Sequence, residues 1–401
     1  MKKILTLLLA AAMVTTAGAK KPAKQQQPEG YKFTDKILVP TTPVKNQHRS
    51  GTCWCYSTVS FLENELLKQG YGEIHLSEMY VVRHAYKEKA RKYIRLQGHL
   101  NFAEGGASHD VMAAISKYGI VPQEVYAGFN YGTDKADFHE LSPVLKNYLD
   151  GVLQGSQYGR RALSTAWERG FDAILDEYFG ELPETFTWNG KEYTPKSFAE
   201  SLPINMDDYI DITSFTHHPF YSKFIIELPD NWIWGEVYNL PLDEFTQVVD
   251  YALENGYSVA WGTDVSEKGF SRTKSIGIVP DVDLDGMSGT ESARWGNLTK
   301  EELAAMAYKF EGPVKELEIN QEMRQVAFDN FETTDDHGMV IMGTAVDQMG
   351  NNYYKVQNSW DVNNTYKGFW YFSKPFFQYK TTSITINKNA LPAEIKAKLG
   401  L

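Results

Sequence analysis

Cysteine is scarce in this sequence, since only Cys53 and Cys55 occur among 401 residues. Exported domains that rely on disulfides carry several cysteines, at spacings that allow more than one bridge. Residues two positions apart point to different sides of a helix, so a bond between these two thiols is not expected. The scarcity therefore excludes a disulfide scaffold and makes chemical reactivity the first explanation to test for the two thiols.

Positive charge and long apolar runs are also lacking. The formal net charge is −11 and the pI about 5.4, which argues against a nucleic-acid-binding surface and against an anionic membrane as partner. After residue 19, no apolar stretch is long enough to cross a membrane as a helix. The fractions of hydrophobic residues (42%) and charged residues (23%) are those of globular proteins, and the length suits one elaborated domain or two modest ones.

The N-terminus has the pattern of a signal peptide over residues 1–19. Two lysines precede the apolar run Ile4–Val14, which is too short to span a membrane, and Ala17–Ala19 forms a small-x-small cleavage site. We therefore expect an exported protein, either periplasmic or secreted. Residues 20–33 are expected to be a disordered lead-in, and residues 34–401 to form the folded domain.

Helical patterns dominate the first part of the remaining sequence, and strand patterns dominate its last third. Helices are predicted for Cys53–Gln69, Asp110–Tyr118 and Leu242–Glu254, and strands for Tyr257–Gly262, Met339–Val346, Tyr353–Trp360, Phe369–Phe372 and Thr382–Ile386. The region 131–239 mixes helical and aromatic segments and contains no recognisable motif. This order of elements predicts an α+β protein with two unlike lobes.

Cys53 is predicted to lie at the N-terminus of a helix, directly after a tight turn at Gly51-Thr52. A helix N-terminus lowers the pKa of a thiol, and so does a neighbouring imidazolium, which provides the thiolate that a nucleophile needs. Gln47 lies six residues upstream, and its side-chain amide could join the backbone N–H of Cys53 in an oxyanion hole. A buried structural role is the alternative for this cysteine.

His337 is the best candidate for a catalytic base among nine histidines. It opens a strand, and Asn358 lies on the returning strand of the same predicted hairpin, so antiparallel pairing brings the two side chains close together. An asparagine there can accept the second imidazole N–H and fix the orientation of the ring. Trp360, two residues further on, could shield this hydrogen bond from water.

Two other histidine positions are weaker candidates. His48 is only five residues from Cys53, but it sits in a polar turn without a residue to orient its ring. His217 and His218 are adjacent, so they do not share a helix face, and no third ligand is apparent near them. We therefore expect His337 to be the base, and we expect no metal site and no cofactor.

The acidic segment Asp281–Gly286 imitates the start of a calcium-binding loop, with aspartates at alternate positions before a glycine. A loop of this type needs a bidentate glutamate at its twelfth position. That position is Ser292 here, and Glu291 comes one residue early. A solvated acidic loop is the better interpretation.

Four segments together carry a family resemblance. They are Gln47–Ser57 around Cys53, Asp336-His337-Gly338, Gln357-Asn358-Ser359-Trp360 and Glu104-Gly105-Gly106. These segments resemble the active-site segments of papain-like cysteine peptidases. The resemblance implies a two-lobed papain-like fold in which Cys53, His337 and Asn358 act as nucleophile, base and orienting residue. It also implies that the two glycines form a wall of the substrate cleft, and we add Trp54 to the substrate-binding candidates.

Within that family the sequence resembles bleomycin hydrolase and bacterial aminopeptidase C. His337 follows Cys53 by 284 residues (337 − 53), against ~130–150 in papain-type enzymes, and the excess is mostly an insertion at about 131–239. Ser50 stands where papain relatives have a cysteine that forms a disulfide. The resemblance implies removal of amino acids from peptide N-termini, with peptides as substrates and a homo-hexamer as the assembly.

In that branch a C-terminal arm lies in the cleft and blocks long substrates. Here the last predicted helix, Pro392–Leu399, leaves almost no residues for such an arm. An exported endopeptidase with an open cleft is therefore the first alternative, and tolerance of N-blocked peptides is its expected sign. A catalytically silent peptide-binding protein on the same fold is the second alternative.

Overall fold

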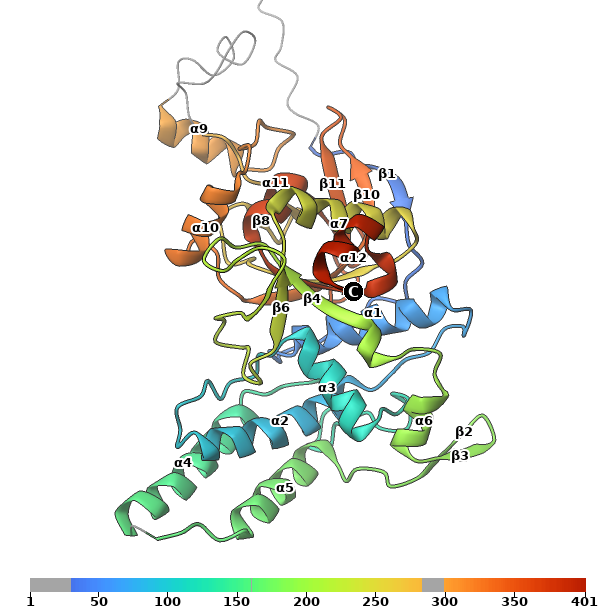
Figure 1. The fold of residues 1–401 in the computed structure, drawn as a ribbon, viewed down its shortest axis with the longest axis vertical. Coiled ribbons are helices and arrows are strands. Elements are labelled where there is room, and N and C mark those ends of the chain that lie inside the picture. The colour runs from blue at the N-terminus through green and yellow to red at the C-terminus, as the bar shows by residue number, and fades with distance from the viewer. Residues whose placement is uncertain (1–29, 160, 283–298) are drawn as a thin grey trace, which may run out of the picture.

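The computed structural model describes residues 30–159, 161–282 and 299–401. In this part of the chain, buried apolar side chains form two large clusters, one in a helical lobe and one around a large sheet. Figure 1 shows the helical lobe below the sheet lobe, with helix α1 (Cys53–Lys68) between them. The predicted α+β fold with two unlike lobes is confirmed.

The helical lobe follows from amphipathic segments that bury one face each. Besides α1 it contains α2 (Glu78–Arg95), α3 (Ser108–Tyr118), α4 (Leu141–Gly159), α5 (Ala166–Phe179), α6 (Pro195–Ser201) and a small hairpin of β2 (Phe186–Trp188) and β3 (Lys191–Tyr193). The 3-10 turn η1 (Met206–Asp208) leads from this lobe into the sheet.

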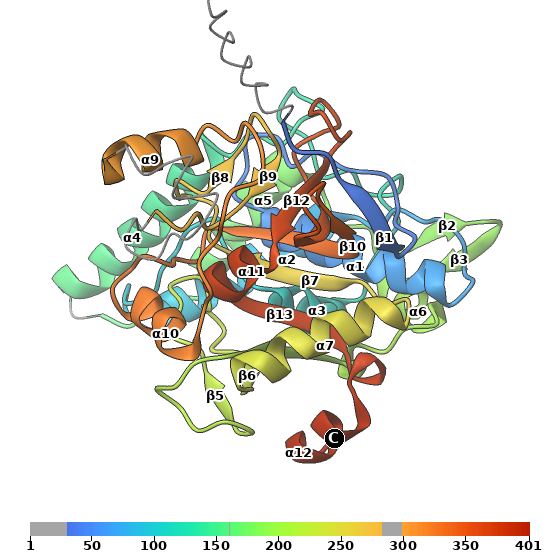
Figure 2. The same cartoon turned by 90° about the horizontal axis from the view of Figure 1, so that it is seen from above.

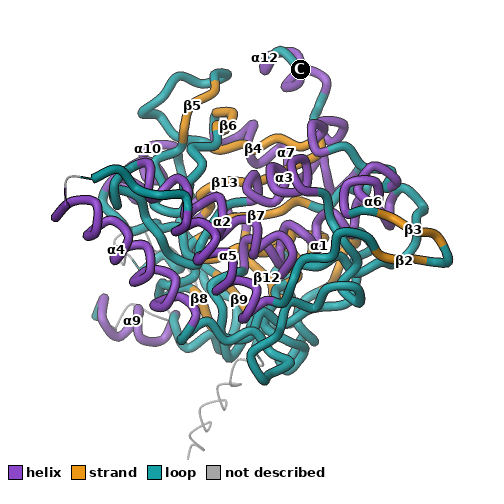
Figure 3. The backbone as a smooth tube through the Cα atoms, turned by 90° about the horizontal axis from the view of Figure 1, so that it is seen from below, coloured by secondary structure: helices purple, strands orange, loops and turns teal. Residues whose placement is uncertain are grey.

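The sheet lobe is built on one sheet of 11 strands, in the order β5-β6-β4-β13-β7-β10-β11-β12-β9-β8, with β1 paired to the far end of β10. The strands are β1 (Thr34–Leu38), β4 (Tyr209–Thr213), β5 (Lys223–Ile225), β6 (Glu236–Asn239), β7 (Val259–Thr263), β8 (Phe270–Ser271), β9 (Ile276–Gly277), β10 (His337–Val346), β11 (Asn352–Gln357), β12 (Phe369–Ser373) and β13 (Thr381–Asn387). Figure 3 shows β4, β13 and β7 side by side across the middle of the molecule, and Figure 2 shows β13 and β7 from the opposite side.

The helical elements of the sheet lobe are α7 (Leu242–Glu254), α9 (Lys300–Ala307), α10 (Gln321–Asp329), α11 (Lys374–Lys380), η2 (Lys388–Ala390) and α12 (Ala393–Leu399). Helix α12 begins after Pro392 and ends at Gly400, which adopts a left-handed conformation. Its side chains Ile395 and Leu399 are buried in the core of the sheet lobe. The predicted C-terminal helix is therefore confirmed.

Helix α1 is buried over most of its length because it packs against both lobes. It contacts α2 and α3 on one side and strands β7 and β10 on the other. The helix begins at Cys53, as predicted, and its C-cap Gln69 is followed by Gly70 with a φ of +77°, which glycine adopts readily. The N-terminus of α1 therefore opens at the boundary between the lobes.

Strands β10 and β11 form the predicted hairpin. Val340 pairs with Gln357 near its open end, although the register shifts once further along the pair. His337 is the first residue of β10, and Asn358 follows β11 directly. The hairpin therefore brings His337 and Asn358 to the same edge of the sheet, beside the N-terminus of α1.

The region 131–239 divides between the two lobes instead of forming a separate body. Its helices α4, α5 and α6 extend the helical lobe, whereas β4 pairs with β13 and β6 pairs with β4 inside the large sheet. The segment 226–235 connects β5 to β6. We call it the 226–235 loop, and it reaches the boundary between the lobes.

Three sequence expectations concern the chain ends and the acidic segment. Of the predicted lead-in 20–33, the structure describes residues 30–33, where Phe33 stacks on Tyr371 at a centroid distance of 4.0 Å. The predicted signal peptide, residues 1–19, lies outside the described residues. So do residues 283–298, which include residues 283–286 of the acidic segment. Among the described residues, no helix has the length and apolar character needed to cross a bilayer.

Candidate active site

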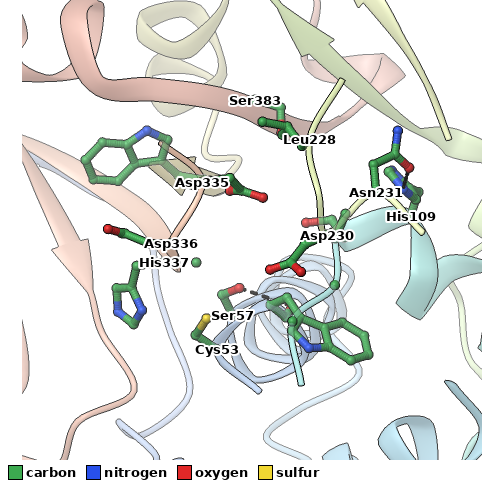
Figure 4. Close-up of a pocket in the computed structure, with 18 of the residues that line it drawn as sticks. Cys53, Ser57, His109, Leu228, Asp230, Asn231, Asp335, Asp336, His337 and Ser383 are labelled. Carbon is green, nitrogen blue, oxygen red and sulfur yellow. Dashed lines mark hydrogen bonds between the residues drawn. The ribbon is translucent and has the colours of Figure 1, made fainter. Parts of the chain in front are cut away.

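A cavity opens between the lobes at the N-terminus of α1 (Figure 4). Cys53, the first residue of the helix, lines this cavity, and its sulfur lies at the cavity edge. Thr52 does not cap the helix with its side chain, because its hydroxyl pairs with that of Ser50 at 2.6 Å. The positive end of the helix dipole therefore acts on Cys53 without a competing side-chain cap.

His337 and Asn358 form a hydrogen bond at the open end of the β10–β11 hairpin. His337 Nε2 lies 2.8 Å from Asn358 Oδ1. The backbone N–H of Ser359 also donates to this oxygen, at 2.7 Å. This second donor fixes the orientation of the Asn358 amide, so that its oxygen and not its nitrogen faces the His337 ring. Nε2 must then carry the proton and donate it, which leaves Nδ1 unprotonated in the neutral ring. Figure 4 shows the ring beside the Cys53 sulfur.

Trp360 covers this hydrogen bond. Its ring stacks on the His337 ring at a centroid distance of 4.3 Å, and the guanidinium of Arg272 lies 4.8 Å from the Trp360 centroid. Asn358 is only 3% exposed. The bond between His337 and Asn358 is therefore shielded from water, which strengthens it.

Gln47 is buried, does not line the cavity, and is held at both ends of its amide. Its Oε1 accepts from the Ser359 hydroxyl at 2.6 Å, and its Nε2 donates to the Ser50 carbonyl at 2.7 Å. A side-chain amide has two N–H groups, so a second donor remains after the bond to Ser50. This rigid amide ties the segment before Cys53 to the segment after Asn358.

The segment with Gly105 and Gly106 forms another wall of the cavity. It is held from behind, because Lys89 Nζ donates to the Gly105 carbonyl at 2.5 Å and Trp54 Nε1 donates to the Glu104 carbonyl at 3.0 Å. A Cβ on Gly106 would lie 2.9 Å from atoms of the Trp54 ring, so glycine permits this close packing. Trp54 is 5% exposed and mainly supports the wall.

Burial shapes the protonation of the two reactive side chains. It raises the pKa of the Cys53 thiol to about 12 and lowers the pKa of His337 to about 4, and the hydrogen bond that His337 donates to Asn358 opposes the second shift. Each charge alone is therefore unfavourable. Transfer of the thiol proton to His337 creates both charges together, and each then stabilises the other.

Two carboxylates that the sequence did not single out line the same cavity. Asp335 lies two residues before His337, and Asp230 lies in the 226–235 loop; Figure 4 shows both pointing into the cavity. The position of Asp335 next to the histidine segment is a signal that could have identified it. No motif marks Asp230, because it lies in the region 131–239.

Cys55 and His48 do not line the cavity. Cys55 is fully buried, its sulfur lies 3.4 Å from the carbonyl oxygen of Glu78, and both cysteines are free thiols, as expected. His48 is exposed on the loop before Cys53, with a φ of 51°. Cys55 is therefore part of the packed core, and the His48 side chain is in contact with solvent.

His217 and His218 have a third candidate ligand that was not apparent in the sequence. Glu227 Oε2 lies 3.1 Å from His217 Nε2, and Glu227 Oε1 lies 3.2 Å from His218 Nε2. The three side chains are close enough to hold a metal ion. Glu227 belongs to the 226–235 loop but does not line the cavity, whereas its neighbours Ile226 and Leu228 do. The group therefore lies on the opposite face of that loop.

Comparison with protein families gives a match to the Peptidase C1-like family over residues 81–287 and 304–400. The matched part includes His337 and Asn358 and begins after Cys53. It covers well over half of the chain.

Individual relatives agree with this match. Aminopeptidase G from Lactobacillus delbrueckii subsp. lactis is 23% identical over 396 residues, covering 88% of this chain and 82% of that protein. Aminopeptidase C from Lactococcus lactis subsp. lactis is 24% identical with the same coverage. Mitochondrial cysteine proteinase 1 from Saccharomyces cerevisiae is 22% identical over 417 residues, covering 93% of this chain and 80% of that protein.

A solved structure shares the fold. PepW from Lactobacillus rhamnosis HN001 superposes with a TM-score of 0.69 at 22% identity, covering 92% of this chain and 84% of that chain. The resemblance inferred from the four motif segments is thereby confirmed. The chain belongs to the Peptidase C1-like family and is a cysteine-type peptidase with a papain-like fold.

Proposed function

We propose that this peptidase uses Cys53, His337 and Asn358 as its catalytic triad and that it removes residues from the free N-terminus of peptides. The hydrogen bond between His337 and Asn358, formed beside the thiol at the start of α1, carries the proposal. The names of the relatives aminopeptidase C and aminopeptidase G support the N-terminal specificity.

The reaction begins with proton transfer from the Cys53 thiol to Nδ1 of His337. The thiolate sulfur then attacks the carbonyl carbon of the scissile bond. Asn358 keeps accepting the Nε2 hydrogen bond, so the ring cannot rotate away from the sulfur. The backbone N–H of Cys53 and the second N–H of Gln47 stabilise the oxyanion that forms.

The second half of the reaction reverses the direction of proton transfer. The imidazolium of His337 donates its proton to the leaving amine, the C–N bond breaks, and a thioester on Cys53 remains. A water molecule then gives a proton to Nδ1 and attacks the thioester carbon. The carboxylic acid product leaves, and the thiol is restored.

An endopeptidase is the second candidate, and the place of the C-terminal helix favours it. Helix α12 packs into the sheet-lobe core, and Lys398 forms an ion pair of 2.7 Å with Glu244 of α7. The described residues of α12 therefore do not line the cavity. The two candidates differ in one property, which is whether the cavity requires a free α-amino group on the substrate.

The triad is tested with a fluorogenic aminoacyl amide and the variants Cys53→Ala and Cys55→Ala. We expect Cys53→Ala to lower kcat by more than about 10³-fold, since the nucleophile is lost, and Cys55→Ala to keep most activity. Iodoacetamide should inactivate the wild type. Full activity in a folded Cys53→Ala variant would show that the nucleophile is assigned wrongly. A wild type that binds peptides without cleaving them would support the silent binding protein.

We also propose that the protein is exported, on the pattern of residues 1–19. The mass of the protein recovered from outside the cytoplasm measures this directly. We expect a chain that begins near Lys20. An intact N-terminus on protein that stays in the cytoplasm would contradict export.

A further inference from the structure

The cavity beside Cys53 is acidic. Among the described residues that line it are Asp230, Asp335 and Asp336, and no lysine or arginine is among them. A surplus of carboxylates in one cleft is unfavourable unless hydrogen bonds or a cation compensate for it. The three aspartates therefore need separate explanations.

Asp336 is satisfied by the protein itself. Its two carboxylate oxygens accept the backbone N–H groups of Val265 and Ser266, at 2.8 and 3.0 Å. These bonds fix the segment that precedes His337. Asp336 therefore has a structural role, and its charge needs no ligand.

Asp230 is only partly satisfied. In the described chain its side chain accepts one hydrogen bond, from Asn101 Nδ2 to Oδ1 at 2.8 Å. The other oxygen, Oδ2, lies over the glycine wall, where a Cβ on Gly105 would meet it at 1.8 Å. One carboxylate oxygen thus lies against the wall along which the substrate backbone is expected to run, and no hydrogen bond to it occurs among the described residues.

A buried asparagine fixes the 226–235 loop that carries Asp230. Asn231 is 4% exposed, and its Nδ2 donates to the carbonyls of Ile226 and Gly235 at 3.0 Å each. Its Oδ1 accepts the Gly235 N–H at 2.7 Å and lies 2.9 Å from His109 Nε2. Because these hydrogen bonds close the loop around the Asn231 side chain, they hold the neighbouring residue Asp230 in place.

Asp335 faces the same space and is also poorly satisfied. Its one hydrogen bond in the described chain comes from the Thr382 hydroxyl, at 3.3 Å. Burial and the charge of Asp230 raise the pKa of Asp335 to about 7, and burial raises the pKa of Asp230 as well. Two carboxylates that disfavour each other's charge are stabilised by a cation placed between them.

The nearest protein cations are engaged elsewhere. Lys89 Nζ donates to the carbonyls of Ala103 and Gly105, at 2.8 and 2.5 Å. His109 Nδ1 lies 2.6 Å from the carboxylate of Asp211. The charges of Lys89 and His109 oppose the upward pKa shifts of Asp230 and Asp335, but in the described chain neither cation forms a hydrogen bond with these carboxylates, which leaves a place for a cationic ligand in contact with both.

We propose that Asp230 and Asp335 form an ammonium-binding subsite, which holds the free α-amino group of the substrate while Cys53 attacks the carbonyl that follows. The inference rests on the proposed peptidase function and names the residues that select free N-termini. A blocked or extended peptide presents an uncharged amide at this point. Both carboxylates then lose water without gaining a cation, which weakens binding.

A lysine or arginine side chain of the substrate offers similar chemistry. The α-amino group is favoured, because Asp230 lies against Gly105 on the wall of the cleft, where the peptide backbone would pass. Two N-acetylated peptides distinguish the α-amino group from a basic side chain as the source of the cation. They differ only at the position before the residue whose peptide bond is cleaved, where one has a lysine and the other a leucine. The α-amino source predicts that both are poor substrates.

The substrate set isolates the charge. An alanyl fluorogenic amide carries the ammonium group, its propionyl analogue lacks only that group, and its N-acetylalanyl analogue replaces it with a neutral amide. The protein variants are Asp230→Asn and Asp335→Asn, which keep the shape of the side chain. Glu227→Gln is the matched control, since it removes a charge from the same loop on the face away from the cavity.

We expect Asp230→Asn and Asp335→Asn each to lower kcat/KM for the alanyl substrate about 10- to 100-fold, the usual effect of losing a charge-assisted hydrogen bond. Their kcat/KM for the propionyl analogue should stay within about twofold of wild type. Glu227→Gln should match the wild type on every substrate. Thermal unfolding shows whether each variant is folded.

Equal losses on all substrates in folded variants would overturn the subsite, because the aspartates would then serve the fold or the triad. A wild type that prefers the acetylated lysyl peptide to the acetylated leucyl peptide and to the alanyl amide would also overturn it. Binding of alaninamide to Cys53→Ala, measured by calorimetry, tests the subsite without turnover. If wild type cleaves nothing while this binding is weakened by Asp230→Asn, the proposed function fails and the subsite stands.

Discussion

The β10–β11 hairpin and the 226–235 loop line one cavity, but different contacts build them. The hairpin pairs neighbouring segments of chain, and His337 and Asn358 are 21 residues apart. The loop depends on the contact between His109 and Asn231, which are 122 residues apart. The hydrogen bond between His337 and Asn358 is thus encoded locally, whereas the cavity wall that carries Asp230 is encoded by contacts between distant segments.

This difference separates two properties of the enzyme. In the proposed function the hairpin supplies the base His337 and its orienting residue Asn358, so changes there should affect every substrate alike. The loop supplies a carboxylate that lies against the glycine wall of the cleft, so under the proposed subsite changes there should affect the choice between substrates. Mutations and pH can break or sharpen this separation.

The largest effect is expected in the hairpin. His337→Ala should lower kcat/KM by more than about 10³-fold on all substrates, because the proposed acceptor of the thiol proton is lost. Asn358→Ala should lower it about 10- to 100-fold, since the base remains but its ring is no longer held. Both are measured by steady-state kinetics on the alanyl and propionyl substrates. Equal losses in two folded variants, or losses on one substrate only, would contradict this division of roles.

A smaller and more selective effect is expected at the glycine wall. Gly105→Ala adds a methyl group that would meet Asp230 Oδ2 at 1.8 Å, so the carboxylate must move away. We expect the preference for the alanyl over the propionyl substrate to fall about 10-fold, as for a weakened charge-assisted hydrogen bond. The control is Gly151→Ala in α4, where an added Cβ meets no atom within 4 Å. If the preference stays while all rates fall, Gly105 serves the reaction itself.

The preference for the alanyl over the propionyl substrate should also depend on pH. Asp335 has a pKa raised to about 7, and Asp230, Asp336 and His109 are the charged groups that act on it. Below that pH the carboxyl group is protonated and neutral, so the preference for the alanyl substrate should fall about 10-fold as pH decreases from 7 to about 5. Above about pH 8 the substrate amine loses its proton, and the preference should fall again.

Taking the ratio of the alanyl and propionyl rates removes the titration of Cys53 and His337, which is common to both substrates. The absolute kcat/KM values should still show a bell-shaped profile whose limbs belong to that coupled pair. In Asp335→Asn the acid limb of the ratio should disappear. A ratio that keeps its acid limb in this variant would assign the titration to another group.

The extent to which the sequence predicts this protein follows the same division. The helix from Cys53 and the hairpin that joins His337 to Asn358 are visible in local patterns, because periodicity and turn residues fix them. Asp230 is not, because its role depends on where the region 131–239 folds back. The same holds for Glu227, which meets His217 and His218 only once the 226–235 loop is formed.

The smallest effect is expected at the outer face of that loop, where Glu227 contacts His217 and His218. The other ring nitrogen of His217, Nδ1, lies 3.1 Å from Nε2 of Gln325, so hydrogen bonds already orient the ring. Neither the triad nor the ammonium subsite uses these side chains. Treatment with a chelator, and His217→Ala, should therefore change kcat/KM by less than about twofold. A loss with the chelator that added zinc restores would show that the two faces of the loop are coupled, and that a metal ion helps to hold Asp230 in place.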